Sequence, residues 1–225
     1  MDPQGMIDGA CHVVWDWNGT LLDDAAACVE ALNRMLARRG LAPTDLELYR
    51  EHFTFPVREY YRTLGFDMDR EDWDRMAREY HAHYAETSVA APLQPGARTV
   101  LESLASGRIG MSVLSACEQC ILDAMLRTHG LDGFFGHVAG LSDLYAASKL
   151  ETGKRLMKRL GLNPAEVVIV GDTLHDHEVA KALRCRCVLV VGGHQSERRL
   201  RQAGRPVATE LPSILGLARQ DWSVR

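Results

Sequence analysis

In this 225-residue chain, two acidic residues follow apolar segments at positions where a strand is expected to end. Asp16 follows the apolar run VVW at 13–15, and Asp172 follows the run VVIV at 167–170 after one glycine. Short apolar runs that end at a glycine-containing turn are typical of buried strands. Parallel strands present their carboxyl ends at one edge of a sheet, where ligands bind in open α/β folds. The sequence therefore predicts that two carboxylates meet at such an edge.

Further polar groups are expected at the same edge. Ser115 follows the apolar run IGMSVL at 109–114, and Lys149 opens a predicted helix ahead of the strand at 167–170. Lys154 is the alternative ammonium, but it lies five residues further along that helix. Carboxylates hold Mg²⁺ together with substrate phosphate oxygens, and a carboxylate can also be a phosphoryl-accepting nucleophile. This set of groups indicates phosphoryl transfer.

Strand-like and helical segments alternate through most of the chain, which is typical of a parallel sheet with helical crossovers. The predicted strands are 13–15, 109–114, 137–139, 167–170 and 188–191. The predicted helices of this part are 25–39, 97–106, 119–129, 148–160 and 176–183. Continuous apolar strands fit a sheet that is covered on both faces. We expect the α/β class, a doubly wound parallel sheet of about five strands, and one or two short helices in the tail.

The segment 22–89 contains no strand-like alternation and is rich in helix formers, aromatic residues and charge. Beyond the helix at 25–39, it divides into predicted helices at 44–52, 57–64 and 70–86, and residues 90–96 form a return linker. The expected organisation is a core of residues 1–21 and 90–225 with a helical cap inserted at 22–89.

Composition restricts the class of protein. The net charge of −4 and the pI near 6.1 give no support for a nucleic-acid partner. No basic and apolar leader opens the sequence, and no apolar run approaches the ~18 residues of a membrane span, so we expect a cytoplasmic protein without a membrane partner. Six cysteines are expected as reduced thiols rather than a metal centre. The oligomeric state is left open.

Taken in order, four short motifs resemble those of the haloacid dehalogenase (HAD) superfamily, in its phosphoglycolate-phosphatase-like branch with a helical cap. The run DWNGT at 16–20 resembles the first motif, DxDGT, and GDTLHD at 171–176 resembles the fourth, GDxxxD. Ser115 and Lys149 resemble the second and third motifs. The resemblance covers nearly the whole chain, and it implies a Rossmann-like core and Mg²⁺-dependent hydrolysis of a small-molecule phosphate ester.

The resemblance also implies a role for each acidic residue. Asp16 would be the nucleophile, forming an aspartyl-phosphate, and a Mg²⁺ ligand beside the backbone carbonyl of Asn18. Asp172 would be the second carboxylate ligand, and Asp176 would support either the metal or Lys149. A structural alternative exists for Asp176, as the N-cap of a helix.

The phosphoryl group would be held by Ser115, the adjacent Ala116, and Lys149, which offset the charge of the transition state. Thr20 would orient the loop or donate to the phosphoryl group. The structural alternatives are a turn role for Ser115 and an exposed helix start for Lys149.

One position departs from the family pattern, because Asn18 stands where the second acid of DxDGT is expected. An amide does not exchange a proton near neutral pH, and losing a general acid–base group typically costs ~10²–10⁴-fold in rate. The chain is then a slow phosphatase, a phosphatase for a good leaving group, or one that recruits another group such as His175 or His177. The rival hypothesis is a catalytically weak or inactive phosphate-binding or regulatory protein. The absence of lysine from 22–89 argues against a phosphonatase.

The cap is expected to select the substrate, with the segment 54–61 as the specificity segment. Arg58 is a candidate ligand for a second anionic group such as a carboxylate, and an exposed arginine at a helix start is the alternative. The aromatic residues at 53, 55, 60 and 61 are predicted to pack the cap rather than to contact substrate. A phosphoglycolate-like acid, a sugar phosphate and a nucleotide remain open.

Overall fold

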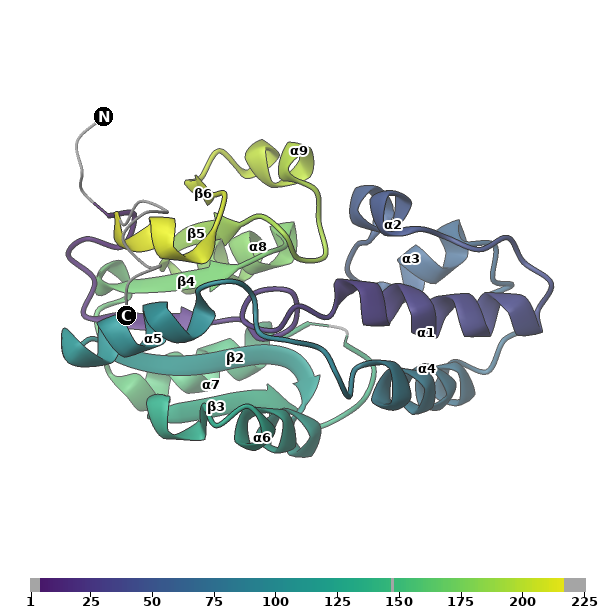
Figure 1. Ribbon diagram of the computed structural model, residues 1–225, viewed down its shortest axis with the longest axis horizontal. Helices are drawn as coiled ribbons and strands as arrows, with labels where there is room; N and C mark the ends of the chain where they lie inside the picture. The colour runs from purple at the N-terminus through teal and green to yellow at the C-terminus, as the bar shows by residue number, and fades with distance from the viewer. Residues whose placement is uncertain (1–4, 147, 217–225) are drawn as a thin grey trace.

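A computed structural model describes residues 5–146 and 148–216 of the chain (Figure 1). The strands are β1 (His12–Trp15), β2 (Gly110–Glu118), β3 (His137–Leu141), β4 (Val167–Gly171), β5 (Arg186–Val190) and β6 (Val207–Ala208). The α-helices are α1 (Ala25–Arg38), α2 (Leu46–His52), α3 (Val57–Thr63), α4 (Trp73–Thr87), α5 (Ala97–Ser106), α6 (Gln119–Thr128), α7 (Leu150–Leu160), α8 (Leu174–Leu183) and α9 (Glu197–Leu200). Short 3-10 helices are η1 (Asp132–Phe134), η2 (Pro164–Glu166), η3 (Arg201–Ala203) and η4 (Leu211–Leu215).

The sheet has the strand order β3-β2-β1-β4-β5-β6, and every neighbouring pair is parallel. β1 is central, because it pairs with β2 on one side and with β4 on the other. The predicted α/β class with a doubly wound parallel sheet is thereby confirmed. The sheet has six strands rather than about five, since the two-residue β6 pairs with the end of β5.

Helices cover both faces of the sheet, and successive residues of β1 divide between the two layers. Val13 and Trp15 belong to a buried cluster that includes apolar residues of α5 and α6. Val14 belongs to a second cluster with residues of α7, α8 and α9. This two-residue alternation is the side-chain period of a strand. It makes β1 a rigid base for the residues that follow it.

β2 is longer than its sequence predicts. It continues through Ser115 to Glu118, with a register shift against β3 between Leu114 and Glu118. Ser115 therefore lies within the strand, not after it. The apolar pattern breaks at Ser115, so hydropathy alone places the end of the strand too early.

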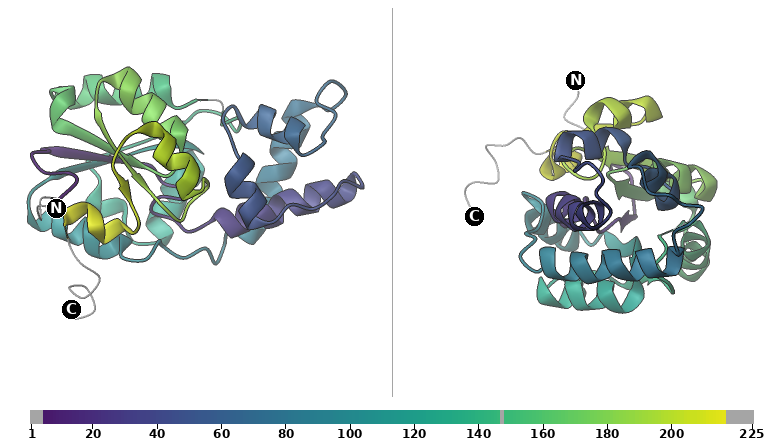
Figure 2. Two further views of the ribbon diagram at one scale, coloured as in Figure 1. Left: turned by 90° about the horizontal axis from the view of Figure 1, so that it is seen from above. Right: turned by 90° about the vertical axis from the view of Figure 1, so that its right-hand side faces the viewer.

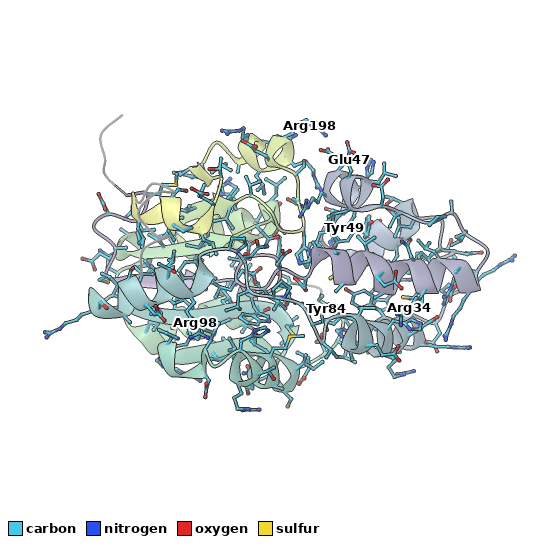
Figure 3. All side chains as sticks on the ribbon, in the orientation of Figure 1. Arg34, Glu47, Tyr49, Tyr84, Arg98 and Arg198 are labelled. Atoms are coloured by element: carbon cyan, nitrogen blue, oxygen red, sulfur yellow. The ribbon has the colours of Figure 1, made fainter. Side chains whose placement is uncertain are left out.

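Helices α1 to α4 lie beyond the carboxyl edge of the sheet and have an apolar core of their own (Figures 1 and 2). Its fully buried members include Met35, Leu36, Tyr60 and Met76. Tyr49 and Tyr84 lie on the side of these helices that faces the sheet (Figure 3). The helices match the predicted all-helical segment, while its boundaries as a domain at residues 22 and 89 stay a prediction. No helix in the described ranges has the length and apolarity to cross a membrane.

Hydrogen bonds join α2 and the segment after it to the loop that follows β5 (Figure 1). Arg50 Nε donates to the carbonyl of Gly193 at 2.8 Å, and the backbone N–H of Ser196 donates to the carbonyl of Arg50 at 3.1 Å. Gln195 Nε2 donates to the carbonyl of Phe53 at 3.0 Å. The helical group is thus tied to the sheet by hydrogen bonds as well as by its covalent connections.

Candidate active site

Lys149 lies between two carboxylates at the carboxyl edge of the sheet. Its Nζ is 2.6 Å from Asp16 Oδ1 and 2.6 Å from Asp176 Oδ1, and it donates to the carbonyl of Leu114 at 3.1 Å. Lys149 directly precedes α7, and only 2% of it is exposed. Lys154, the alternative considered from the sequence, is exposed and pairs with Glu151.

Asp176 occupies the third position of α8 and forms a capping box with Thr173. The backbone N–H and the hydroxyl of Thr173 donate to Asp176 Oδ2 at 2.9 and 2.7 Å. Asp176 is therefore not the N-cap residue itself, which is Thr173. Its other oxygen lies next to Lys149, so the Asp176 carboxylate both caps the N-terminus of α8 and forms an ion pair with the Lys149 ammonium.

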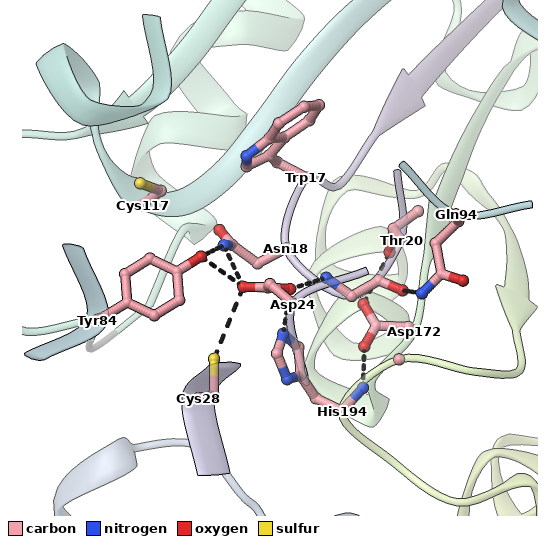
Figure 4. Close-up of polar contacts among 12 residues, drawn as sticks. Trp17, Asn18, Thr20, Asp24, Cys28, Tyr84, Gln94, Cys117, Asp172 and His194 are labelled. Atoms are coloured by element: carbon pink, nitrogen blue, oxygen red, sulfur yellow. Dashed lines mark hydrogen bonds and ion pairs between the residues drawn. The ribbon is translucent and has the colours of Figure 1, made fainter. Parts of the chain in front are cut away.

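Asp172 is fixed by donors on both oxygens. Thr20 Oγ1 donates to Asp172 Oδ1 at 2.7 Å, and the backbone N–H of His194 donates to Oδ2 at 2.6 Å (Figure 4). Two glycines allow this approach: a Cβ atom at Gly19 or at Gly193 would lie 2.3 or 2.2 Å from Asp172 Oδ2. Gly19 also has a φ of +75°, which favours glycine.

Three buried carboxylates, those of Asp16, Asp172 and Asp176, have oxygen atoms within 4.8 Å of one another. Burial raises the pKa of Asp16 to about 8; Lys149 opposes the rise, and the other two carboxylates add to it. Burial and Asp176 raise the pKa of Asp172 to about 7. When all three carboxyl groups are ionised, the single ammonium of Lys149 leaves the cluster with an excess of negative charge. The donor set fits a hard divalent cation such as Mg²⁺, which binds carboxylate oxygens.

Asn18 is held by a hydrogen-bond network at the start of α1 (Figure 4). Its Nδ2 donates to Asp24 Oδ2 at 2.8 Å and to Tyr84 Oη at 2.9 Å. The Tyr84 hydroxyl in turn donates to Asp24 Oδ2 at 2.6 Å, and the backbone N–H of Gly19 donates to Asp24 Oδ1 at 2.8 Å. Asp24 is fully buried. The amide of Asn18 donates a hydrogen bond to the Asp24 carboxylate, whereas an aspartate at position 18 would place a second carboxylate next to it.

His194 completes this network from the loop after β5. Its Nε2 is 3.5 Å from Asp24 Oδ1, and its Nδ1 is 2.9 Å from Tyr49 Oη. Sequence reasoning assigned no role to Asp24, Tyr84 or His194. His194 carried a usable signal, because it follows a predicted strand and two glycines and therefore reaches the same sheet edge. Nothing in the sequence indicated that Tyr49 and Tyr84 would meet it.

The remaining predicted residues divide into two groups. Ser115 and Ala116 line one cavity with Asp16 and Lys149, and Ser115 Oγ accepts from the N–H of Cys117 at 3.0 Å. Arg58 does not lie with them: it is exposed, and its Nη2 donates to the carbonyl of Met68 at 3.2 Å.

The two histidines of the fourth motif also separate. His175 lines the cavity and stacks on Phe55, with ring centroids 4.7 Å apart, whereas His177 is not among the cavity residues. Burial, reinforced by Lys149, lowers the pKa of His175. A neutral imidazole therefore faces the cavity near neutral pH.

Comparison with known proteins gives consistent matches. Residues 13–190 match the model of the family described as haloacid dehalogenase-like hydrolase. A phosphoglycolate phosphatase of Pseudomonas putida is 26% identical over 211 residues, covering 90% of this chain and 75% of that protein. A phosphoglycolate phosphatase of Rhodospirillum rubrum is 29% identical over 196 residues, covering 82% and 81%.

Solved structures share the fold. A hydrolase of the haloacid dehalogenase-like family from Streptococcus pneumoniae superposes with a TM-score of 0.76 at 19% identity, covering 90% of this chain and 95% of that one. At this identity the likeness concerns the fold alone.

Proposed function

Because the chain belongs to the haloacid dehalogenase-like hydrolases, as its sequence predicted, we propose that it hydrolyses a small-molecule phosphate monoester with Asp16 as the nucleophile. The observation that carries this proposal is the position of Asp16. Its buried carboxylate touches Lys149 at 2.6 Å and opens on the same cavity as Ser115. A carboxylate, an ammonium and a hydroxyl thus line one cavity, where they could serve as the nucleophile and as two groups that bind phosphoryl oxygens.

In the proposed reaction the Asp16 carboxylate attacks phosphorus, and the bond to the ester oxygen breaks. Lys149 donates to Oδ1 of Asp16, and we assign the attack to Oδ2. Water then attacks the aspartyl-phosphate, inorganic phosphate leaves, and the carboxylate is restored. This sequence of steps consumes one water and leaves the enzyme unchanged.

Lys149 supplies a permanent positive charge next to the transferring group. Burial opposes its protonation, but the carboxylates of Asp16 and Asp176 outweigh burial and raise the pKa of Lys149. Mg²⁺ bound to Asp16, Asp172 and the Asn18 carbonyl would add positive charge where the phosphoryl oxygens bind. Ser115 would donate its hydroxyl to one of these oxygens.

The helices α1 to α4 form the cap in this proposal, covering the cavity and excluding water from the reacting atoms. Asn18 orients groups through its amide but donates no acidic proton, so departure of the alcohol depends on the alcohol itself. An inactive phosphate-binding protein is not favoured, because the matching family is one of hydrolases and a buried ammonium lies against the carboxylate proposed as the nucleophile.

Turnover of p-nitrophenyl phosphate with Mg²⁺ tests the proposal, since this leaving group needs little protonation. The natural chain should hydrolyse the ester, and Asp16→Asn should reduce turnover to background. Asp23→Asn is a matched control, because Asp23 is an acid of the same loop that does not line the cavity. Equal rates for the natural chain and Asp16→Asn would refute the role of Asp16.

A further inference from the structure

The cavity that begins at Asp16 continues into the helical group. Its volume is about 130 Å³, and its outer walls come mainly from α2, α3, α4 and the segment between α2 and α3. Aromatic rings dominate these walls, among them Phe55, Tyr61, Trp73 and Tyr80. An aromatic ring placed beyond the phosphoryl site would therefore lie against other aromatic rings, in the edge and stacked contacts that such rings favour.

The walls of this cavity offer no free cation to a second anionic group. Lys149 is the one lysine or arginine among the described lining residues, and it already contacts two carboxylates. Arg58, the sequence candidate for such a contact, is exposed and bonded to the Met68 carbonyl. A substrate carboxylate would thus be buried among aromatic rings with no lysine or arginine to pair with, and neutral hydroxyl donors such as that of Tyr60 offset the loss of its hydration less than a cation would.

The departure of the ester oxygen gives a second, independent argument for an aromatic substrate. Asn18 Nδ2 donates to Asp24 and to Tyr84, and an amide supplies no acidic proton. Phenolic oxygens ionise near pH 10, far more readily than alkyl alcohols. An aryl oxygen can therefore leave as its anion where an alkyl oxygen needs protonation.

From these observations we propose that the substrate is a phosphate ester of an uncharged aromatic hydroxyl compound, whose ring occupies the aromatic part of the cavity. This inference rests on the proposed function and differs from the substrate in the names of the bacterial relatives. The phosphorus–oxygen bond to the ring oxygen breaks, the new bond forms to Asp16, and the aryl oxide takes its proton from water.

Binding of two matched phosphonates tests the inference without any turnover. Benzylphosphonate carries a ring where phosphonoacetate carries a carboxylate, and neither is hydrolysed as an ester. Isothermal titration calorimetry of the natural chain with Mg²⁺ should show benzylphosphonate binding at least tenfold more tightly. Equal binding, or tighter binding of phosphonoacetate, would overturn the inference even if the chain proves to be an active phosphatase.

Two substitutions in the cavity sharpen the test. Trp73→Ala should weaken benzylphosphonate about tenfold by removing a ring contact, and should leave phosphonoacetate unchanged. Val57→Arg places a cation in the cavity wall and should shift the preference toward phosphonoacetate. Leu48→Ala is the control, because Leu48 is 50% exposed on α2 outside the cavity. If Leu48→Ala and Trp73→Ala change the preference equally, the aromatic wall is not the ring site.

Discussion

Replacing Asn18 by aspartate should destabilise the fold, although aspartate is the residue that the family motif leads one to expect. The amide nitrogen of Asn18 lies 2.8 Å from Oδ2 of the fully buried Asp24. An introduced carboxylate would put two negative charges in the same small space. At a separation of about 4 Å and an effective dielectric constant of 20, such a pair repels by about 4 kcal/mol. That energy corresponds to a rise of about three units in the pKa of the introduced carboxyl group.

The expected penalty depends on pH with a definite sign. A carboxyl group whose pKa is raised by folding destabilises the folded state only at pH values above its pKa in the unfolded chain, where the unfolded chain has lost the proton. Asn18→Asp should therefore lower the free energy of unfolding by about 1.5 kcal/mol at pH 5 and by about 4 kcal/mol at pH 8. Urea unfolding of both proteins at the two pH values measures the difference.

Two controls separate charge repulsion from other causes. Asn18→Ala removes the same hydrogen bonds without adding charge, so its penalty should be similar at pH 5 and pH 8. Asn18→Asp combined with Asp24→Asn exchanges the amide and the carboxylate, and should recover most of the stability lost at pH 8. A penalty for Asn18→Asp that is equal at both pH values, or that the exchange leaves intact, would refute this account of position 18.

Three further predictions concern the carboxylate cluster. Lys149→Met should lower the free energy of unfolding by about 3–5 kcal/mol, because it leaves buried carboxylates without their cation. Lys154→Met, at an exposed position, should lower it by at most ~1 kcal/mol, and urea unfolding measures both values. Gly19→Ala should lower the melting temperature and Mg²⁺ affinity together, since its Cβ would lie 2.3 Å from Asp172 Oδ2; unchanged affinity would contradict this. Mg²⁺ should raise the melting temperature more at pH 8.5 than at pH 6.5, because protons compete at carboxyls with pKa near 8 and 7, and Asp172→Asn should abolish the rise.

Local patterns predicted most of the fold, because each element follows a simple period. α5 begins and ends at the predicted residues, and β1 differs by one residue. β6 was missed because two residues are too few to show alternation, and β3 and β2 continue past the apolar runs that suggested them. Backbone pairing extends these strands, and pairing is not visible in hydropathy.

The site was predictable where it follows strand ends and not where it depends on the helical group. Asp16, Asp172 and Lys149 meet as expected, since parallel topology determines their positions. The partners of Asn18 come from α4 and from the start of α1, and their approach depends on how the helices sit against the sheet. No spacing in the sequence encodes that arrangement.

The loop after β5 has one further consequence, because it contacts a carboxylate of the proposed metal site and the helical group at once. His194 donates its backbone N–H to Asp172, and its neighbours Gly193 and Gln195 bond to Arg50 and to the backbone beyond α2. Through this segment, any opening or closure of the helices would be coupled to occupation of the proposed cation site. If closure of the helices strengthens cation binding by a given factor, then cation binding favours closure by the same factor. Metal concentration would then shift the equilibrium between closed and open arrangements of the helices.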